Sequence, residues 1–331
     1  MDKVSAAKSL RASLCLSACL AIFAGCGGSQ PPIDTRGVVP QTSAIARHTA
    51  RGNSWMLPEA KSEGLLYTSS GRTMVYVFSY PQGKWVGTLS GFDGANGECI
   101  DKAGDVFITN SGTSQVFEYA HGGTAPTNTL NDEAYQPISC SVDPISGNLA
   151  VANFSGSSVS IYNKAVGDPT VYSTPGLVIE FCGYDDKGNL FVDGYVSRQF
   201  SLRELTAGSG TFQSINVDQS VYSPGPIQWD GNYLALGYGQ QNRALIYQLS
   251  ISGTAAHVVT TTQLEGPGKF AIGDGAQWWI RDEKIVAPYF QRGPKSDHIG
   301  FWKYPGGGEP VKRINYKEAQ DKQLWGITIS P

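Results

Sequence analysis

The sequence predicts an all-β fold, and three observations carry that prediction. Short runs of β-branched and aromatic residues alternate with turns rich in Gly, Asn, Asp, Ser and Pro. No helical periodicity of about 12 residues interrupts residues 64–331. A similar pair of runs recurs at a nearly fixed interval along the same stretch, which is typical of a repeat architecture.

The repeated element is a short apolar stretch with an aromatic residue or Leu near its end, followed by a turn that contains Gly. It begins at Val75, Val116, Val159, Phe200, Ala244 and Ile299. The successive intervals are 41, 43, 41, 44 and 55 residues. An interval of roughly 40–50 residues with Gly-rich turns and several short strands indicates a β-propeller blade. We therefore expect a six-bladed β-propeller of four-stranded blades.

The second unit shows the expected order of strands most completely. Its inner, second, third and outer strands are predicted at 98–101, 105–110, 115–120 and 127–130. Side chains alternate between the two faces of a strand, so Val106 and Ile108 should face one side and Phe107 the other.

The two ends of the repeat region complement each other. The first unit, "GLLYTSSGRTMVYVFSY" at 64–80, aligns with the second and third strands and lacks an inner strand. The chain ends in "GITISP", which has the pattern of an inner strand with nothing after it. We expect residues 327–330 to complete the first blade and close the ring, because propellers leave no long sheet edge exposed.

An aspartate recurs in the turn after each complete inner strand. The five are Asp101, Asp143, Asp185, Asp230 and Asp274. A short acceptor side chain there can hold the turn by bonding nearby backbone N–H groups. A calcium loop does not fit, because Lys187 stands where the second ligand after Asp185 would be. Asp193 departs from the repeat, and we expect it near an exposed blade edge.

The order of inner strand, Asp, Gly-Asn and β-strand resembles the NHL-repeat and SMP-30/gluconolactonase-like six-bladed propellers. The resemblance covers residues 64–331 and rests on phrases such as "GDVFITN", "SVDPISGNLAV" and "CGYDDKGNLFVDG". More narrowly, the chain resembles bacterial propeller lipoproteins of uncharacterised function. Repeat motifs identify a fold and not a reaction.

Residues 1–25 have the pattern of an export signal. Lys3, Lys8 and Arg11 precede an apolar run of about a dozen residues, too short to span a bilayer comfortably. "FAGC" then ends at Cys26 and resembles the lipobox of bacterial lipoproteins, with Phe23 in place of the usual Leu. The resemblance implies lipidation of Cys26; the alternative is an ordinary secretory signal with an incidental cysteine.

Residues 26–63 are polar, rich in Gly, Pro and Ser, and without periodicity, so we expect a flexible tether whose end, with Trp55 and Met56, packs on the propeller. We therefore expect a monomer that is exported and anchored by lipid to the cell envelope, on the periplasmic side or at the cell surface.

The chain is acidic overall, with a formal charge of −3, and has no basic block, so nucleic acid is not an expected partner.

Three cysteines remain in the predicted propeller. Cys140 and Cys182 occupy matching positions three residues before their Asp, whereas Cys99 is one residue out of register and should point the other way unless a bulge intervenes. Buried thiols are one interpretation, and a disulfide within any pair of the three is another, provided that the Cα atoms lie within roughly 7 Å. No nearby His suggests a nucleophilic cysteine.

The lactonase resemblance implies a divalent metal, such as Ca²⁺, at one mouth of the channel. The matching positions start the inner strands: Glu98, Ser139, Glu180, Gln228, Lys269 and Trp325. Only Glu98 and Glu180 are anionic, and Lys269 would oppose a cation, so the ligand set is incomplete. We expect no cofactor unless this alternative holds.

The long last interval suggests an interaction loop within "RDEKIVAPYFQRGPKSDH" at 281–298. It carries Arg281, Tyr289, Phe290 and Arg292, and aromatic residues with Arg are favoured in interfaces. The expected function is a binding or interaction scaffold for a protein, glycan or small ligand. The alternative is a metal-dependent lactonase or other hydrolase at the channel mouth; no catalytic residue can be named, and a purely structural envelope role is a third hypothesis.

Overall fold

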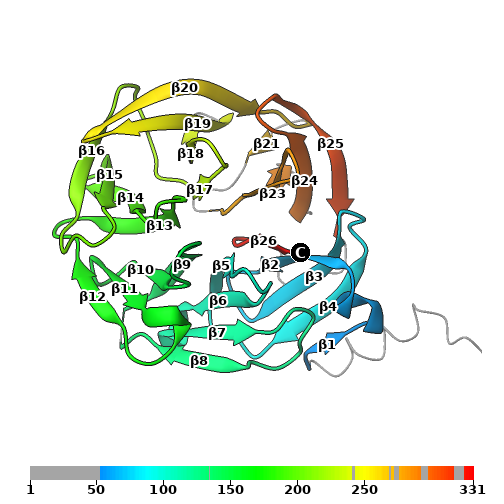
Figure 1. The fold of residues 1–331 in the computed structure, drawn as a ribbon. Coiled ribbons are helices and arrows are strands. Elements are labelled where there is room, and N and C mark those ends of the chain that lie inside the picture. The colour runs from blue at the N-terminus through cyan, green and yellow to red at the C-terminus, as the bar shows by residue number, and fades with distance from the viewer. Residues whose placement is uncertain are drawn as a thin grey trace, which may run out of the picture.

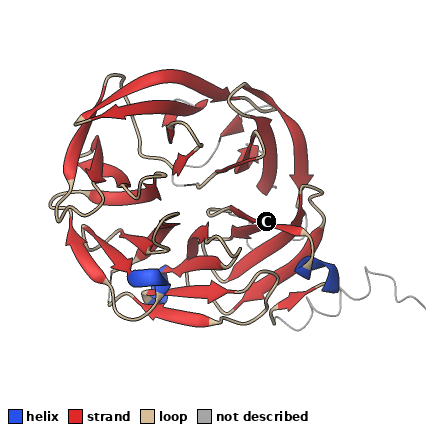
Figure 2. Cartoon of the chain, viewed as in Figure 1, coloured by secondary structure: helices blue, strands red, loops and turns tan. Residues whose placement is uncertain are grey.

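The computed structural model describes residues 53–133, 135–240, 243–267, 270–271, 276–291, 297–316 and 324–331. Over these ranges the chain is strand and turn, apart from short 3-10 helices (Figure 2). They are Pro58–Lys61 (η1), Ser111–Thr113 (η2) and Asn163–Ala165 (η3). The all-β prediction is confirmed for this part of the chain. The predicted signal segment, Cys26 and the first part of the tether lie outside it.

Consecutive strands pair antiparallel into meanders that stand around a common centre (Figure 1). The first meander contains β1 (Trp55–Met56), β2 (Gly64–Ser69), β3 (Met74–Tyr80) and β4 (Trp85–Ser90). The second contains β5 (Ala95–Ile100), β6 (Val106–Asn110), β7 (Gln115–Tyr119) and β8 (Asn128–Asn131). The third contains β9 (Pro137–Val142), β10 (Leu149–Asn153), β11 (Ser158–Tyr162) and β12 (Thr170–Ser173).

The later meanders follow the same plan and are joined along their outer strands. The next contains β13 (Val178–Tyr184), β14 (Leu190–Val196), β15 (Gln199–Leu205) and β16 (Gln213–Val217). It is followed by β17 (Ile227–Trp229), β18 (Leu234–Gln240), β19 (Arg243–Ser252) and β20 (Ala255–Leu264). The last contains β21 (Phe270–Ala271), β22 (Trp279–Arg281), β23 (Lys284–Gln291), β24 (Asp297–Lys303) and β25 (Gly307–Asn315). Parallel pairing of β16 with β20, and of β20 with β25, links these three meanders.

The end of the chain returns to the first sheet. β26 (Thr328–Ser330) pairs antiparallel with β2, with Leu65 opposite Ser330 and Tyr67 opposite Thr328. The strand lies where the first unit of the sequence lacks an inner strand. β1 pairs with β4 at the other edge of the same sheet, and Trp55 is buried there, so the end of the predicted tether packs on the sheet as expected.

The strands of the second unit lie close to their predicted positions. β6, β7 and β8 each begin and end within one residue of the prediction. β5 begins at Ala95, three residues before the predicted start at Glu98, because a register irregularity between these residues lengthens the strand. A bulge of this kind leaves no mark in the hydrophobic pattern.

Both faces of β6 are buried, because its sheet packs against a neighbouring sheet on either side. In β6, Val106 and Ile108 join a cluster with Leu65 and Tyr67 of the first sheet. Phe107 of the same strand joins another cluster, with side chains of the β9–β12 sheet. The predicted division of β6 into two faces is therefore confirmed.

Over its described part, the predicted interaction loop at 281–298 consists of strands and a tight turn. β22 and β23 form a hairpin whose turn residues, Asp282 and Glu283, have φ values of 50° and 55°. This left-handed turn contains neither Gly nor Asn, the residues that mark such a turn most strongly in a sequence. Tyr289 is 1% exposed, and its ring lies 5.7 Å from that of Trp302. Arg292 lies outside the described residues.

Two other members of the predicted interaction loop are also strand residues. Arg281 ends β22, and its guanidinium donates to the carbonyl oxygen of Ile329 at 3.4 Å. Phe290 lies in β23 and is partly buried. The described residues of this segment thus belong to a sheet and not to a projecting loop.

Candidate binding site at the central channel

The recurring aspartates hold the turns that end the inner strands. Oδ1 of Asp185 accepts the N–H groups of Lys187 at 2.9 Å and Asn189 at 2.8 Å. The equivalent oxygens of three other aspartates accept N–H groups two to four residues downstream in the same way: Asp101, Asp143 and Asp230. The structural interpretation of these four residues is confirmed; Asp274 lies outside the described residues.

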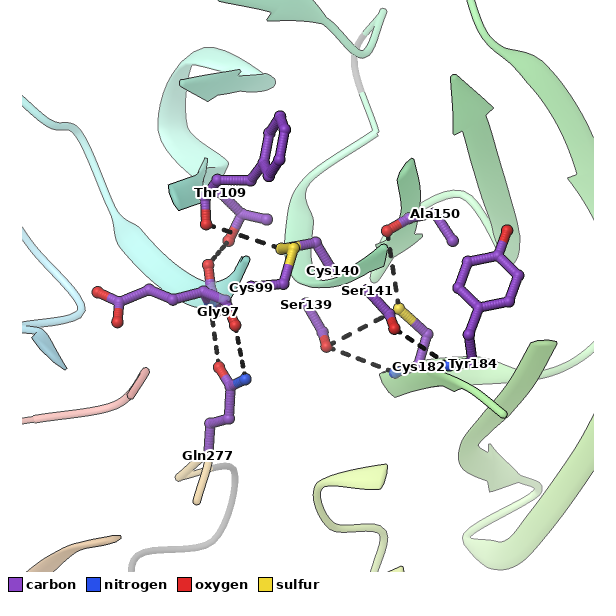
Figure 3. Close-up of a disulfide and its surroundings, with 12 residues drawn as sticks. Gly97, Cys99, Thr109, Ser139, Cys140, Ser141, Ala150, Cys182, Tyr184 and Gln277 are labelled. Atoms are coloured by element: carbon purple, nitrogen blue, oxygen red, sulfur yellow. Dashed lines mark hydrogen bonds between the residues drawn. A yellow bond between two sulfur atoms is a disulfide. The ribbon is translucent and has the colours of Figure 1, made fainter. Parts of the chain in front are cut away.

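A disulfide joins the inner strands of the second and third meanders. Cys99 on β5 and Cys140 on β9 are bonded, with their Cα atoms 5.7 Å apart (Figure 3). Because successive side chains of a strand point to opposite faces, the one-residue offset of Cys99 turns it toward β9, while Cys140 faces β5. The offset that separates Cys99 from the repeat is what allows the two sulfur atoms to meet.

Cys182 lies one sheet further along and carries a free thiol. Its backbone N–H donates to Oγ of Ser139 at 3.4 Å, and its thiol donates to the carbonyl oxygen of Ala150 at 3.9 Å (Figure 3). Burial raises the pKa of this thiol to about 12. A thiol in this state packs between sheets and is a poor nucleophile at neutral pH.

Two glutamine side chains fasten inner strands to one another. Oε1 of Gln277 accepts the N–H of Glu98 at 2.9 Å, and its Nε2 donates to the carbonyl oxygen of Glu98 at 2.7 Å (Figure 3). Gln228 makes the same pair of bonds with the backbone of Ile280, at 2.7 and 2.9 Å. Each amide supplies the donor and acceptor that a neighbouring strand would supply, so the backbone groups facing the channel are satisfied.

An aromatic cavity of about 230 Å³ lies at the C-terminal ends of the inner strands. We call it the tryptophan cavity; its aromatic lining is Phe181, Tyr184, Trp229, Trp278 and Trp279. Trp229 and Trp279 are partly exposed, so their rings are open to a ligand. Among the described residues that line it, Asp185 is the one carboxylate, and its oxygens are taken up by the turn described above.

A second cavity of about 190 Å³ lies at the N-terminal ends of the same strands. We call it the glutamate cavity, after Glu180, which lines it together with Asn96, Ile138, Phe154 and Trp325. In β5, β9 and β13 the residues on this cavity precede those on the tryptophan cavity, so the two lie at opposite ends of the channel. Phe181 and Gln277 line both cavities.

Glu98 and Glu180, the two predicted metal ligands, face different spaces. Glu98 is 0% exposed, and neither of its carboxylate oxygens has a hydrogen-bond partner among the described residues. Burial raises the pKa of Glu98 well above its usual value. Its cross-strand neighbour Ile108 packs with the first sheet, so Glu98 points between sheets and lines neither cavity.

Glu180 does face the channel, and burial raises its pKa to about 7. No group of three or more His, Cys, Asp or Glu side chains that could hold a metal occurs in the described ranges. Two carboxylates that point into different spaces cannot share an ion, so a divalent metal held by Glu98 and Glu180 does not fit this arrangement.

Asp193 corrects a second expectation, because it is not near an exposed edge. The side chain is 0% exposed, and its two oxygens accept the N–H groups of Phe181 at 3.2 Å and Gly225 at 2.9 Å. It therefore connects β13 to the segment that leads into β17. Burial is the main cause that raises the pKa of Asp193, and the neighbouring charge of Glu180 adds to it.

Several residues of the channel carried no signal in the sequence. Gln277, Trp278 and Trp279 lie at the start of the last unit, whereas the repeat had suggested Lys269, which lies outside the described residues. Phe154 follows β10 and had no counterpart in other units.

No helix among the described residues has the length and apolar character needed to cross a membrane.

No family model and no curated protein matches the sequence. Solved structures do match the fold. A chain from a nidogen–laminin complex superposes with a TM-score of 0.60 at 13% identity, covering 81% of this chain and 98% of its own.

A protein of unknown function from Bacteroides caccae superposes with a TM-score of 0.58 at 16% identity, covering 81% of this chain and 99% of its own. The fold is that of a β-propeller. At these identities the likeness concerns the fold alone.

Proposed function

We propose that this protein is an exported, lipid-anchored binding propeller whose ligand site is the tryptophan cavity. The number of meanders and the pairing of β26 with β2 support a ring of six blades closed by the C-terminal strand. The apolar segment before Cys26 supports export and lipid attachment at that residue. The order of strands supports a relation to the NHL-repeat and SMP-30-like propellers.

The composition of the tryptophan cavity carries the proposal. Ligand sites are concave and mostly apolar, with a few polar groups that fix orientation. Here Trp229, Trp279 and Tyr184 supply flat apolar surfaces. The hydroxyl of Ser141 accepts the N–H of Tyr184 and still has its own proton to donate to a ligand. A lining without a free charge favours an uncharged ligand that has an apolar face and hydroxyl groups. The terminal ring of a neutral glycan has this chemistry.

The bonds between inner strands support a preformed site. The Cys99–Cys140 disulfide, the bond from Cys182 to Ser139 and the amide of Gln228 each join strands that line the cavity. A cavity whose walls are fixed before binding costs less ordering when the ligand arrives. This arrangement suits recognition by a rigid surface.

Metal-dependent lactonase or hydrolase chemistry remains the competing hypothesis, and the geometry favours it less. It needs several oxygen ligands that converge at one mouth of the channel. Glu98 is turned between sheets and Glu180 stands beside aromatic rings, so these two residues do not supply that convergence.

Titration of the purified full-length protein with neutral oligosaccharides, followed by tryptophan fluorescence and calorimetry, tests the binding proposal. We expect at least one oligosaccharide to bind, and Trp279→Ala to weaken that binding at least tenfold. Phe117→Ala, which removes a partly buried aromatic ring on β7 that lines neither cavity, is the matched control and should leave the affinity unchanged. Equal affinities of wild type and Trp279→Ala would overturn the proposal.

A divalent ion retained by the purified protein at a one-to-one ratio, and lost on Glu180→Gln, would instead support the lactonase hypothesis. Hydrolysis of ester and lactone substrates would then be the measurement that separates the two functions. The Glu180→Gln variant should still bind oligosaccharide, because Glu180 does not line the tryptophan cavity.

A further inference from the structure

The glutamate cavity differs from the tryptophan cavity in charge. One carboxylate and three aromatic rings line it: Glu180, Phe154, Phe181 and Trp325. Phe154 is 40% exposed, which is high for a large apolar side chain of this protein. Among the described residues that line the cavity there is no Lys, Arg or His. A charge on Glu180 is therefore not balanced by a cation of the cavity wall.

Each side-chain amide of the cavity wall already donates one N–H to the protein. Both polar atoms of the Gln277 side chain bond the backbone of Glu98. Nδ2 of Asn96 donates to Oγ of Ser111 at 2.8 Å. The side-chain oxygen Oδ1 of Asn96 and the carboxylate of Glu180 remain as acceptors. A ligand that donates protons or carries positive charge thus meets complementary groups, whereas an anion does not.

A second buried carboxyl group stands behind the cavity wall. Asp193 interacts electrostatically with Glu180, and its oxygens are held by the N–H groups of Phe181 and Gly225. Phe181, whose N–H it accepts, is itself a wall residue of the cavity. Because burial raises the pKa of Asp193, Glu180 is the group that supplies negative charge to the cavity above its own pKa of about 7.

We propose that the glutamate cavity binds a small organic ammonium ion, with the carboxylate of Glu180 as counter-ion and the rings of Phe154 and Trp325 against its methyl or methylene groups. Aromatic faces attract ammonium groups through the ring quadrupole, and a nearby carboxylate adds charge complementarity. The cavity of about 190 Å³ is smaller than the roughly 300–1,000 Å³ of drug-sized pockets, so it suits a headgroup. The site is separate from the tryptophan cavity and does not depend on the function proposed there.

Calorimetric titration of the full-length protein with choline, and with its uncharged carbon analogue 3,3-dimethyl-1-butanol, tests the charge requirement at pH 8. We expect choline to bind and the analogue to bind at least tenfold more weakly. Glu180→Gln should lower the choline affinity at least tenfold, and Phe154→Ala several-fold. Glu118→Gln alters another partly buried carboxyl, on β7 away from both cavities, and should leave the affinity unchanged.

The pH dependence of choline binding is an independent readout, because choline keeps its charge at every pH. Glu180 has a pKa of about 7 in the folded protein, so the counter-ion is lost as pH falls below this value. We expect the affinity to fall from pH 8 to pH 5 in the wild type and to stay flat in Glu180→Gln. Asp193 is the other titratable group that acts on Glu180, and its carboxyl is common to both proteins.

A third arm separates two sources of the ammonium group. Binding to phosphatidylcholine vesicles that Glu180→Gln abolishes identifies a lipid headgroup, whereas binding of free choline alone identifies a soluble ligand. Either result supports the proposal. The proposal would be overturned by equal affinity for choline and its neutral analogue, or by undiminished choline binding in Glu180→Gln. It would also be overturned if neither free choline nor phosphatidylcholine vesicles bind at pH 8. Matching melting temperatures of the variants and the wild type establish that each is folded.

Discussion

Removal of the Cys99–Cys140 disulfide should lower the free energy of unfolding by about 4 kcal/mol. The two residues are 41 positions apart, and closing a loop of this length removes about 13 cal/mol/K of entropy from the unfolded chain, which is about 4 kcal/mol at 25 °C. The perturbation is the double variant Cys99→Ala and Cys140→Ala. Alanine avoids placing a new hydroxyl in the buried space between β5 and β9.

The assay is urea unfolding followed by tryptophan fluorescence, with and without reductant. With a urea dependence of roughly 2–3 kcal/mol per molar, the expected fall in midpoint is about 1–2 M. Reductant should lower the wild-type midpoint by a similar amount and leave the double variant unchanged. Cys182→Ala, which removes a buried free thiol, should keep the reductant sensitivity. A wild-type midpoint that reductant does not move would refute the assignment of this bond.

Three further predictions address the channel and the membrane anchor. Gln277→Ala leaves the backbone N–H and carbonyl of Glu98 without partners and should lower the unfolding free energy by about 2–4 kcal/mol in the same assay; a change below about 0.5 kcal/mol would contradict the role of this amide. Burial keeps Glu98 protonated in the folded protein, so its contribution is present below about pH 4.5 and is lost as pH rises through the raised pKa. Glu98→Gln should therefore flatten the decline in unfolding free energy between pH 5 and pH 8, and an unchanged slope would count against it. Cys26→Ser should move the protein from the membrane fraction to the soluble fraction and abolish labelling by a palmitate analogue; retention in the membrane would rule out lipidation at this residue.

The repeat made most of the fold predictable, because each unit carries its own alternation of apolar residues and its own turn signals. The strands β6, β7 and β8 and the turn aspartates follow from these local patterns. The last unit did not follow, since its hairpin turns through Asp282 and Glu283, which have left-handed backbone without Gly or Asn. Without Gly or Asn at the turn, the sequence does not show where β22 ends and β23 begins, so the segment was interpreted as a loop.

The channel was less predictable than the strands, because its chemistry arises from contacts between distant units. Gln277 and Glu98 are 179 residues apart, and nothing near either residue indicates that their groups meet. Glu98 stands three residues before Asp101, as Cys140 and Cys182 do before Asp143 and Asp185, and like them it is buried between sheets. The offset of Cys99 was visible in sequence, but the disulfide required knowledge of which strands are neighbours.

A crystal structure of the protein soaked with the oligosaccharide selected by titration tests the central claim most directly. We expect a sugar ring stacked on Trp229 or Trp279 inside the tryptophan cavity, with its hydroxyl groups bonded to polar atoms of the wall. Electron density for the ligand on an outer strand, or in the glutamate cavity at the N-terminal ends of the inner strands, would contradict the assignment of the tryptophan cavity as the ligand site.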